Sequence, residues 1–591
     1  MFLATTALSE FWETREELLF LGPWCLRYSR RGSWEKLKPR VLADPWNDQE
    51  NSRRALAEAS AAYENLLKRL ADRLNQLHGT GHSLRYWRIL LGPWLLGYVS
   101  SFCDRSLHLR AALKDSPGLR TTILDPRDYG TPRDTAQANL WRASDRFNLQ
   151  IYSQAIAHLG LPAETRRLPP SPLEPAAASR WKAAATDALF RIAIGSRVRG
   201  PHAYFSDLYL DRIQTLRLIA ASKFQLRPVL KQLPPDFRFE PLDSPERRGL
   251  ASPAPGSPSG LESLLVSALP AQLPTLFLEG YPALRKLVLG DWPRLPENLV
   301  TSVGFFYNEY FKLLAAESTE RDGRLVIAQH GGGYGMQEMR DNERHERAVA
   351  DLYATWGWKD DFAPGAELTP LPSPRLMPCA PRHGGSSGGD WLMICGTLPR
   401  YPYSWWFADK GAASRFGESL DWRLRFIESL PEPLRRRLLI RLHHADLGWD
   451  QRPRLEERFP RLRFDSTAQW TKRPDLFGLV LIDHPQTSML EALALNVPTL
   501  LFWDPELWPL RPSAQAHFDD LRQAGILLDS PEAAAARAVA LNDDPTRWWR
   551  SEPVQEARAR FCRNFACGSR DWDEIWSRRL GPTPARPEIS S

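Results

Sequence analysis

The 591-residue sequence predicts an α/β fold with two Rossmann-like domains facing a cleft and helical insertions in the first domain. Three observations support this prediction. The chain is longer than the size at which a single hydrophobic core usually keeps growing. Its second half alternates strand and helix patterns, as a parallel sheet does. In both halves a buried strand runs into a polar or glycine-rich turn, where the carboxyl edge of such a sheet presents ligands.

Composition is that of an ordinary globular protein, with 43% hydrophobic and 25% charged residues. No apolar run reaches the ~18 residues of a membrane-spanning helix, and the best one, residues 89–101, is too short. The first residues lack the basic and apolar regions of a secretory signal. We therefore expect residues 2–8 to form the first strand and the protein to be cytoplasmic.

The formal net charge of +7 raises the question of nucleic acid as a partner. Arginines alternate with acidic residues along the whole chain, so nucleic-acid binding is not expected. The same charge favours a weak peripheral contact with the anionic inner membrane. Six cysteines without paired spacing indicate neither a zinc site nor a disulfide framework.

The first half contains predicted strands at 2–8, 18–22 and 325–328. Leucines three and four positions apart predict a helix over 48–77, and a second helix is expected over 344–353. Two stretches rich in proline and small residues, 161–179 and 233–274, are predicted to be mobile insertions.

The second half repeats strand and helix in a βαβ rhythm. Strands are predicted at 391–395, 437–442, 476–483 and 499–503, and helices at 417–429, 489–495, 531–542 and 544–576. We place the domain boundary in the loop 364–389. The expected domains are an acceptor-side domain over 1–375, a nucleotide-binding domain over 388–545, C-terminal helices over 546–580 that pack back on the first domain, and a disordered tail over 581–591.

The turn after the strand 476–483 is the most informative segment. Ser488 and Glu491 have the spacing of a capping box, which would start a helix at the carboxyl end of the strand. Free N–H groups at a helix N-terminus favour an anion such as a nucleotide phosphate. Thr487 and Ser488 would add hydroxyl donors, Glu491 could accept from ribose hydroxyls, and His484 lies in the same turn. The alternative is that Ser488 and Glu491 only cap the helix.

Further phosphate ligands are predicted after two other strands. Arg441 can bind a phosphate with two hydrogen bonds, and a histidine can bind one as a cation or a donor. His443 and His444 are neighbours on an extended chain and should point to opposite sides, so one of them is expected to face the cleft. Thr397 and Arg400 are weaker candidates, and a plain loop explains them equally well.

In the first half, the strand 325–328 ends in the loop of Gln329, His330, Gly331, Gly332, Gly333 and Tyr334. No Gly-Lys-Ser/Thr follows, so this is not a phosphate-binding loop of the ATPase type. Glycines let a ligand approach the backbone, and a histidine near neutrality can act as acid or base. We predict that His330 is the catalytic residue on the acceptor side. If His330 is only structural, the base must be a first-half carboxylate such as Asp104, Asp207 or Glu309.

Residues 2–8, 19–25 and 82–94, the Gln-His-Gly loop and the block 483–498 together resemble a family of bacterial transferases from surface-polysaccharide gene clusters of the O-antigen or capsule type. This family is distantly similar to Kdo transferases and to the polyol-phosphate transferases of teichoic acid synthesis. The resemblance implies a glycosyltransferase of GT-B architecture. It further implies a nucleotide-activated donor, such as CMP-Kdo or another CMP-ulosonic acid, and a surface polysaccharide or lipid-linked acceptor.

The polyol-phosphate transferases also pair a histidine-glycine loop with a later histidine and a Ser/Thr-rich helix start. His330, His443 or His444, and Thr487 with Ser488 match those places in kind. The turn Asp483-His484-Pro485-Gln486 departs from their Asp-Tyr-Ser type. Sugar transfer is therefore the leading interpretation, with polyol-phosphate transfer and a non-catalytic carbohydrate-binding assembly protein as alternatives. No Asp-x-Asp motif stands out, so we expect no metal ion and no cofactor, only the nucleotide-sugar as co-substrate.

Overall fold

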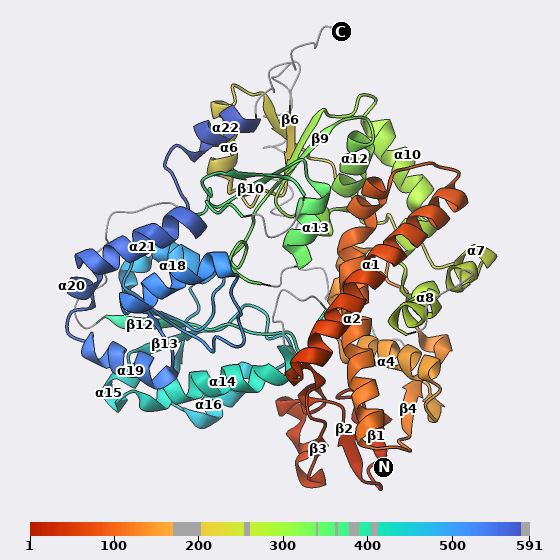
Figure 1. Ribbon diagram of the computed structural model, residues 1–591, viewed down its shortest axis with the longest axis horizontal. Helices are drawn as coiled ribbons and strands as arrows, with labels where there is room; N and C mark the ends of the chain where they lie inside the picture. The colour runs from red at the N-terminus through yellow and green to blue at the C-terminus, as the bar shows by residue number, and fades with distance from the viewer. Residues whose placement is uncertain are drawn as a thin grey trace.

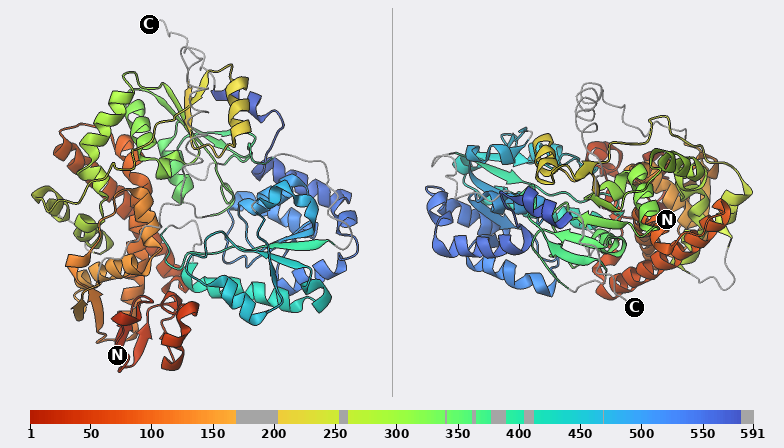
Figure 2. Two further views of the ribbon diagram at one scale, coloured as in Figure 1. Left: turned by 180° about the vertical axis from the view of Figure 1, so that it is seen from behind. Right: turned by 90° about the horizontal axis from the view of Figure 1, so that it is seen from above.

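The computed structural model describes residues 1–168, 203–252, 260–338, 341–360, 365–376, 389–403, 412–467 and 469–580. Within these ranges the chain forms two six-stranded parallel sheets in separate α/β bodies, with long helices beside them (Figures 1 and 2). This arrangement confirms the predicted fold class, in which two Rossmann-like domains are accompanied by helical segments in the first half of the chain.

The first sheet has the order β11-β10-β9-β8-β6-β7, and all its neighbouring strands are parallel. If the six strands are numbered by their position in the sequence, and the sheet is read from β7 to β11, the order is 2-1-3-4-5-6. This is the flavodoxin-like order with one additional strand. The order reverses between β6 and β8. The strands are β6 (Ala203–Ser206), β7 (Leu226–Pro228), β8 (Asn298–Thr301), β9 (Arg324–Ala328), β10 (Leu352–Thr355) and β11 (Glu367–Pro370).

The second sheet has the order β14-β13-β12-β15-β16-β17, which is the 3-2-1-4-5-6 order of the Rossmann fold. Its order reverses between β12 and β15. Strand β15 is buried along its whole length, as expected for a central strand of a parallel sheet. The strands are β12 (Asp390–Ile394), β13 (Leu438–Arg441), β14 (Arg463–Phe464), β15 (Phe477–Ile482), β16 (Thr499–Phe502) and β17 (Leu527–Leu528).

The first 168 residues form a third region beside the two sheets. Short parallel strands β1 (Phe2–Ala4), β2 (Leu18–Phe20) and β3 (Arg40–Val41) join β4 (Thr121–Leu124) and β5 (Ala163–Arg166) through a bridge between Phe2 and Arg120. Helices α1 (Gln49–His78) and α2 (Leu84–Asp115) pack along each other. Asp48 caps the start of α1 through two backbone N–H groups, so the predicted helix 48–77 is confirmed within one residue.

Some predicted elements are wrong in extent. The strands predicted at 2–8 and 18–22 each span only three residues. The predicted insertion 233–274 contains α8 (Leu261–Gln272), whose apolar face is buried against α1 and α2. The helix predicted over 344–353 is α13 (Asp341–Val349), and β10 takes up its last residues. Within the predicted insertion 161–179, residues 163–166 form β5, and 169–179 lie outside the described residues.

The remaining helices of the second half follow the predicted rhythm. They include α14 (Ala412–Ser429), α17 (Thr487–Leu495), α18 (Pro512–Gln523) and α19 (Pro531–Ala540). The helix predicted over 544–576 is instead three helices, α20 (Pro545–Trp549), α21 (Glu552–Phe565) and α22 (Trp572–Leu580). Prolines in the first turns of α20 and α21 start new helices rather than continue one.

Helix α22 packs on the first domain, where Trp572 and Trp576 are buried against the first sheet and α6 (Arg212–Ala221). Most of the predicted boundary loop, residues 377–388, and the predicted tail 581–591 lie outside the described residues. Among the helices described, α2 included, none is long and apolar enough to cross a membrane.

Candidate functional site

A cleft of about 570 Å³ lies where the carboxyl ends of the two sheets meet. Its volume is typical of a pocket for a small molecule or cofactor. Open α/β sheets bind ligands where their strand order reverses, and both reversal points open into this cleft. Most of its lining residues lie in loops that follow strands of the two sheets: β6 (Tyr209), β8 (Val303, Phe306, Tyr307), β9 (His330, Gly331, Gly332), β12 (Thr397), β13 (His443, His444, Ala445, Leu447) and β15 (Gln486, Thr487).

The loop after β9 is shaped by Gln329. The buried Gln329 amide oxygen accepts from the Trp356 backbone N–H at 2.9 Å and from the Trp358 indole N–H at 2.8 Å. Its amide nitrogen donates to the Gly331 carbonyl at 2.9 Å. Gln329 therefore fixes the turn from inside the protein, and the structure does not bring it to the cleft.

His330 lines the cleft with 18% of its side chain exposed. Behind it, the Tyr334 hydroxyl lies 3.2 Å from Nε2 and 3.3 Å from Nδ1, and donates to Glu346 at 2.7 Å. The Tyr353 hydroxyl donates to the other oxygen of this fully buried carboxylate, also at 2.7 Å. A histidine that faces a cleft and is oriented by a carboxylate from behind is the usual arrangement of a general base. Glu346 was not predicted from the sequence.

The glycines of this loop allow close packing between the two domains. A side chain at Gly332 would place its Cβ 2.4 Å from the backbone of both Gln486 and Thr487. The Gly332 N–H donates to the Thr487 hydroxyl at 2.9 Å. Gly332 therefore lets the first domain touch the start of α17, at the edge of the cleft that Gly331 and Gly332 both line. Gly333 has a φ of 85°, which favours glycine, and Tyr334 is buried beneath the loop.

Helix α17 begins at Thr487, directly beyond β15, and Gln486 and Thr487 line the cleft. No side chain caps its N-terminus, so the predicted capping box of Ser488 and Glu491 is wrong. Ser488 lies at the second helical position, and the Glu491 carboxylate pairs with Arg375 at 2.9 Å. Since the side chain of the N-cap residue Gln486 does not cap α17, this helix end can still attract an anion.

His443 and His444 both line the cleft, with their ring centroids 4.1 Å apart. The prediction that they point to opposite sides is wrong, because β13 already ends at Arg441 and the chain turns there. His443 Nδ1 closes this turn, 2.9 Å from the Ala445 carbonyl oxygen and 3.2 Å from the Ala445 backbone nitrogen. Burial lowers the pKa of His443 below its ordinary 6.5. The backbone of Ala445 raises this pKa, and the nearby His444 and His484 lower it. The histidine is therefore mainly neutral at pH 7.

Three predicted phosphate ligands are engaged elsewhere. Arg441 binds Asp465 at 2.5 Å and the Thr467 carbonyl at 2.6 Å. Arg400 is buried, where it binds Asp145 at 2.5 Å and the Trp24 carbonyl at 2.9 Å and so joins the second domain to the first 168 residues. His484 is buried 3.0 Å from Asp483, beneath Gly396.

Thr397 does line the cleft, and its hydroxyl accepts from the Gln451 amide at 2.7 Å.

A protein-family model described as LIC12162 family transferase matches residues 1–580. The chain belongs to this LIC12162 family. It is therefore a transferase. None of the curated proteins matches its sequence.

Three solved glycosyltransferase-related structures resemble parts of this LIC12162-family transferase weakly. Trehalose-6-phosphate synthase OtsA matches with 12% identity and a TM-score of 0.31, over 52% of this chain and 78% of its own. Spinosyn forosaminyltransferase SpnP matches with 11% identity and a TM-score of 0.32, over 65% and 98%. WaaG, a glycosyltransferase involved in lipopolysaccharide biosynthesis, matches with 14% identity and a TM-score of 0.27, over 52% and 96%. Likenesses at these TM-scores carry no argument about activity.

Arg375 is a cleft residue of the LIC12162-family transferase that sequence reasoning missed. It follows β11, pairs with Glu491 across the domains, and lies with its guanidinium carbon 5.7 Å from the centre of the Tyr209 ring. Burial raises the pKa of Glu491, while Arg375 opposes the rise. A strand before Arg375 was the signal that could have identified it, but the prolines around β11 hid this strand.

The structure separates the three carboxylates named as alternative bases. Asp104 is buried with Arg105 and Trp46, and Glu309 is buried with Lys312. Asp207 is exposed at the end of β6, two residues before Tyr209 of the cleft. Of the three, only Asp207 is placed at the edge of the cleft.

Proposed function

We propose that this LIC12162-family transferase is a glycosyltransferase that moves a sugar from a nucleotide-activated donor to an acceptor hydroxyl. One observation carries the proposal: the reversal points of both sheets open into a single cleft, with an uncapped helix N-terminus on one wall and a carboxylate-backed histidine on the other. The first feature suits a phosphate leaving group, and the second suits removal of a proton.

The second domain is the proposed donor site. A nucleotide phosphate would lie at the start of α17, between Thr397 and Thr487, which follow the two strands at the reversal point. His443 and His444 would donate hydrogen bonds to it from the next strand end. Arg375 reaches the same place from the first domain and would supply positive charge to the leaving phosphate.

His330 is the proposed base. The acceptor oxygen attacks the anomeric carbon and gives its proton to the His330 imidazole. The bond from the anomeric carbon to the phosphate oxygen breaks, and its electron pair leaves with the nucleotide. Glu346 lies with Oε1 3.8 Å from His330 Nδ1 and would stabilise the imidazolium that forms. Arg375 and the N–H groups around the phosphate would do the work of a metal ion, so we propose that the transfer needs none.

The finer identity of the substrates rests on the sequence resemblance. It supports a CMP-activated ulosonic acid such as Kdo as donor, and a surface polysaccharide or a lipid-linked acceptor. The net charge of +7 supports a peripheral contact with an anionic membrane, where such an acceptor would lie.

Calorimetric titration with CMP, UDP, GDP and CDP-glycerol tests the donor site. We expect one of the four to bind, and Thr487→Val to weaken that binding by about 0.5 to 1.5 kcal/mol, the usual contribution of a neutral hydrogen bond. Thr546→Val, at the start of α20 and away from the cleft residues, is the matched control and should bind as the wild type does. Equal affinity in both variants would remove the site from α17, and binding of CDP-glycerol alone would favour polyol-phosphate transfer.

A further inference from the structure

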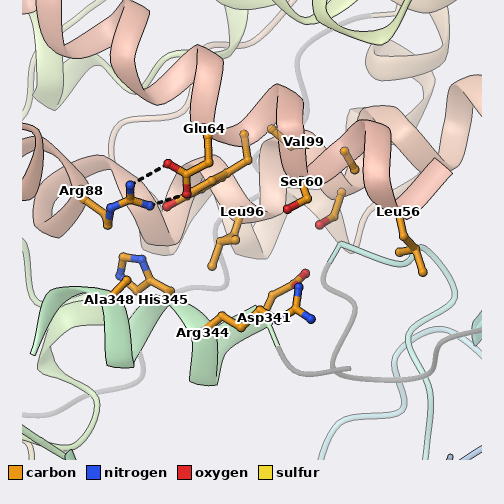
Figure 3. A pocket seen from close by; sticks show the side chains of 13 residues that line it. Leu56, Ser60, Glu64, Arg88, Leu96, Val99, Asp341, Arg344, His345 and Ala348 are labelled. Atoms are coloured by element: carbon orange, nitrogen blue, oxygen red, sulfur yellow. Dashed lines mark hydrogen bonds and ion pairs between the residues drawn. The ribbon is translucent and has the colours of Figure 1, made fainter. Parts of the chain in front are cut away.

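A second pocket, of about 120 Å³, lies outside the transfer cleft between α1, α2 and α13. Figure 3 shows side chains of all three helices facing the space between them. The α2 wall includes Arg88, which belongs to the segment 82–94 singled out in the sequence and does not line the transfer cleft. The volume is roughly ten times what one buried water needs, so the space suits a larger ligand.

The floor of this pocket holds a polar side chain with no protein partner. His345 of α13 is 4% exposed, and neither of its ring nitrogens has a hydrogen-bond partner among the described residues. Burial lowers its pKa to about 3, with repulsion from Arg88 and Lys312 adding to the effect. The imidazole is therefore neutral, with one donor and one acceptor. Buried polar atoms are normally paired, so these two nitrogens indicate that something else binds there.

Gly92 of α2 lets the His345 ring pack closely against this helix. A side chain at Gly92 would place its Cβ 2.3 Å from His345 Cε1 and 3.0 Å from the Tyr63 hydroxyl oxygen. Both polar groups thus lie close to a position of α2 that lacks a side chain. Any larger residue would displace the imidazole from the pocket.

The walls combine apolar surface with balanced charge. Apolar side chains line part of the pocket, namely those of Leu56, Ala59, Leu96 and Val99. Ser60 adds a hydroxyl at the rim. Arg88 and Glu64 neutralise each other through two hydrogen bonds of 2.7 Å (Figure 3). Asp341 and Arg344 contribute one charge of each sign. A pocket without net charge, with donors, acceptors and an apolar wall, suits an uncharged ligand that carries several hydroxyl groups.

We propose that the pocket between α1, α2 and α13 binds an uncharged sugar ring. The hydroxyls of the ring would bond to His345, Tyr63 and the Arg88–Glu64 pair, and its C–H face would pack on Leu96 and Val99. Leu96 also lines the transfer cleft, so the ring would lie next to the reacting groups. The inference goes beyond the proposed function, because sugar binding at this place requires no transfer in the cleft.

Saturation-transfer NMR with the methyl glycosides of glucose, galactose, mannose and rhamnose tests this inference on the full chain. We expect at least one glycoside to bind, and Ser60→Phe, which fills the pocket from its rim, to weaken that binding about tenfold or more. Ala61→Phe places the same ring on an exposed position of α1 outside the pocket and should bind as the wild type does.

A second variant, His345→Phe, replaces the imidazole with an aromatic ring that has no nitrogen atoms. It should weaken glycoside binding to a similar degree. The inference is overturned if none of the four glycosides binds, if Ser60→Phe binds as well as Ala61→Phe, or if glucose 6-phosphate binds more tightly than the methyl glycosides. The nucleotide titration of the cleft is a separate readout. A protein that binds glycosides in this pocket and no nucleotide would disprove the proposed transfer and leave this inference standing.

Discussion

His330 lines the cleft, and both of its ring nitrogens lie within 3.3 Å of the Tyr334 hydroxyl, with Glu346 close behind. If it takes the acceptor proton, His330→Ala should lower turnover roughly 100- to 10,000-fold, the usual contribution of a positioned acid or base. The donor site lies on the other domain, so nucleotide affinity should stay the same. Steady-state kinetics and calorimetry measure the two effects.

Tyr209→Phe is a useful comparison for His330→Ala, because it changes an exposed cleft residue without removing the imidazole. Wild-type turnover in His330→Ala would reduce the histidine to a loop-shaping residue. In that case Asp207, at the edge of the cleft, becomes the next candidate for the base.

His443 gives the donor site a pH dependence. Its pKa lies below 6.5 in the free protein, and a bound phosphate favours the imidazolium and raises it. Nucleotide binding should therefore take up protons, and affinity should rise as the pH falls through the range below 6.5. Calorimetry near pH 6 in buffers of different ionisation enthalpy measures this uptake.

His443→Gln keeps a hydrogen-bond donor but cannot take up a proton. We expect the proton uptake to disappear in this variant, while binding at pH 8 changes little. Uptake that is unchanged in His443→Gln would show that the phosphate lies away from this histidine.

At the scale of elements, the strands that end in polar or glycine turns could be predicted closely. Strands β9, β12, β15 and β16 lie within one residue of their predicted bounds, because an apolar run and the turn after it are local signals. Strand β11 and helix α8 could not be predicted, since both lie in proline-rich sequence and are stabilised by distant partners. Strand β11 pairs with β10, and α8 packs on α1 and α2.

The candidate site, too, could be predicted only where local sequence signals define it. The loops after β9, β13 and β15 could be predicted because they follow clear strands, and His330, His443 and Thr487 indeed share one cleft. The sequence could not show that Arg400 is held by Asp145, 255 positions away in the chain. Nor could it show that Glu346 lies behind His330. Contacts of this kind depend on how elements pack, which no local pattern encodes.

The start of α18 is joined to α13 by a buried ion-pair network. Arg511, just before α18, binds Glu343 at 2.8 Å and Asp360 at 2.7 Å, and both carboxylates also bind Arg347. Removing one partner of a buried pair leaves charge uncompensated, so Arg511→Met should destabilise the protein by about 3 to 5 kcal/mol. Thermal or urea unfolding measures the loss.

Arg522→Met is the matched control, because Arg522 of the same helix pairs with Asp519 of α18 and with Asp529 after β17, whose side chains are both exposed. Surface pairs contribute roughly 0 to 1 kcal/mol, so this variant should unfold close to the wild type. Equal effects of the two substitutions would mean that the Arg511 network does not stabilise the joined domains.

At the scale of the whole molecule, three sets of contacts hold the domains around the cleft. Gly332 touches Thr487, Arg375 pairs with Glu491, and Arg511 joins α13 to the second domain. The first 168 residues add Asp145, which binds Arg400 of the second domain. The walls of the cleft are thus fixed relative to each other from several sides. This arrangement suits a reaction in which a donor on one domain meets a base on the other.

The central claim is that the donor phosphate binds at the start of α17, facing His330 across the cleft. A crystal structure of the protein with the nucleotide that binds most tightly in the titration tests it most directly. The account predicts phosphate oxygens within hydrogen-bond distance of the Thr487 backbone N–H or hydroxyl and of His443 or His444. A nucleotide bound outside this cleft, or one whose phosphates point away from α17, would contradict the account.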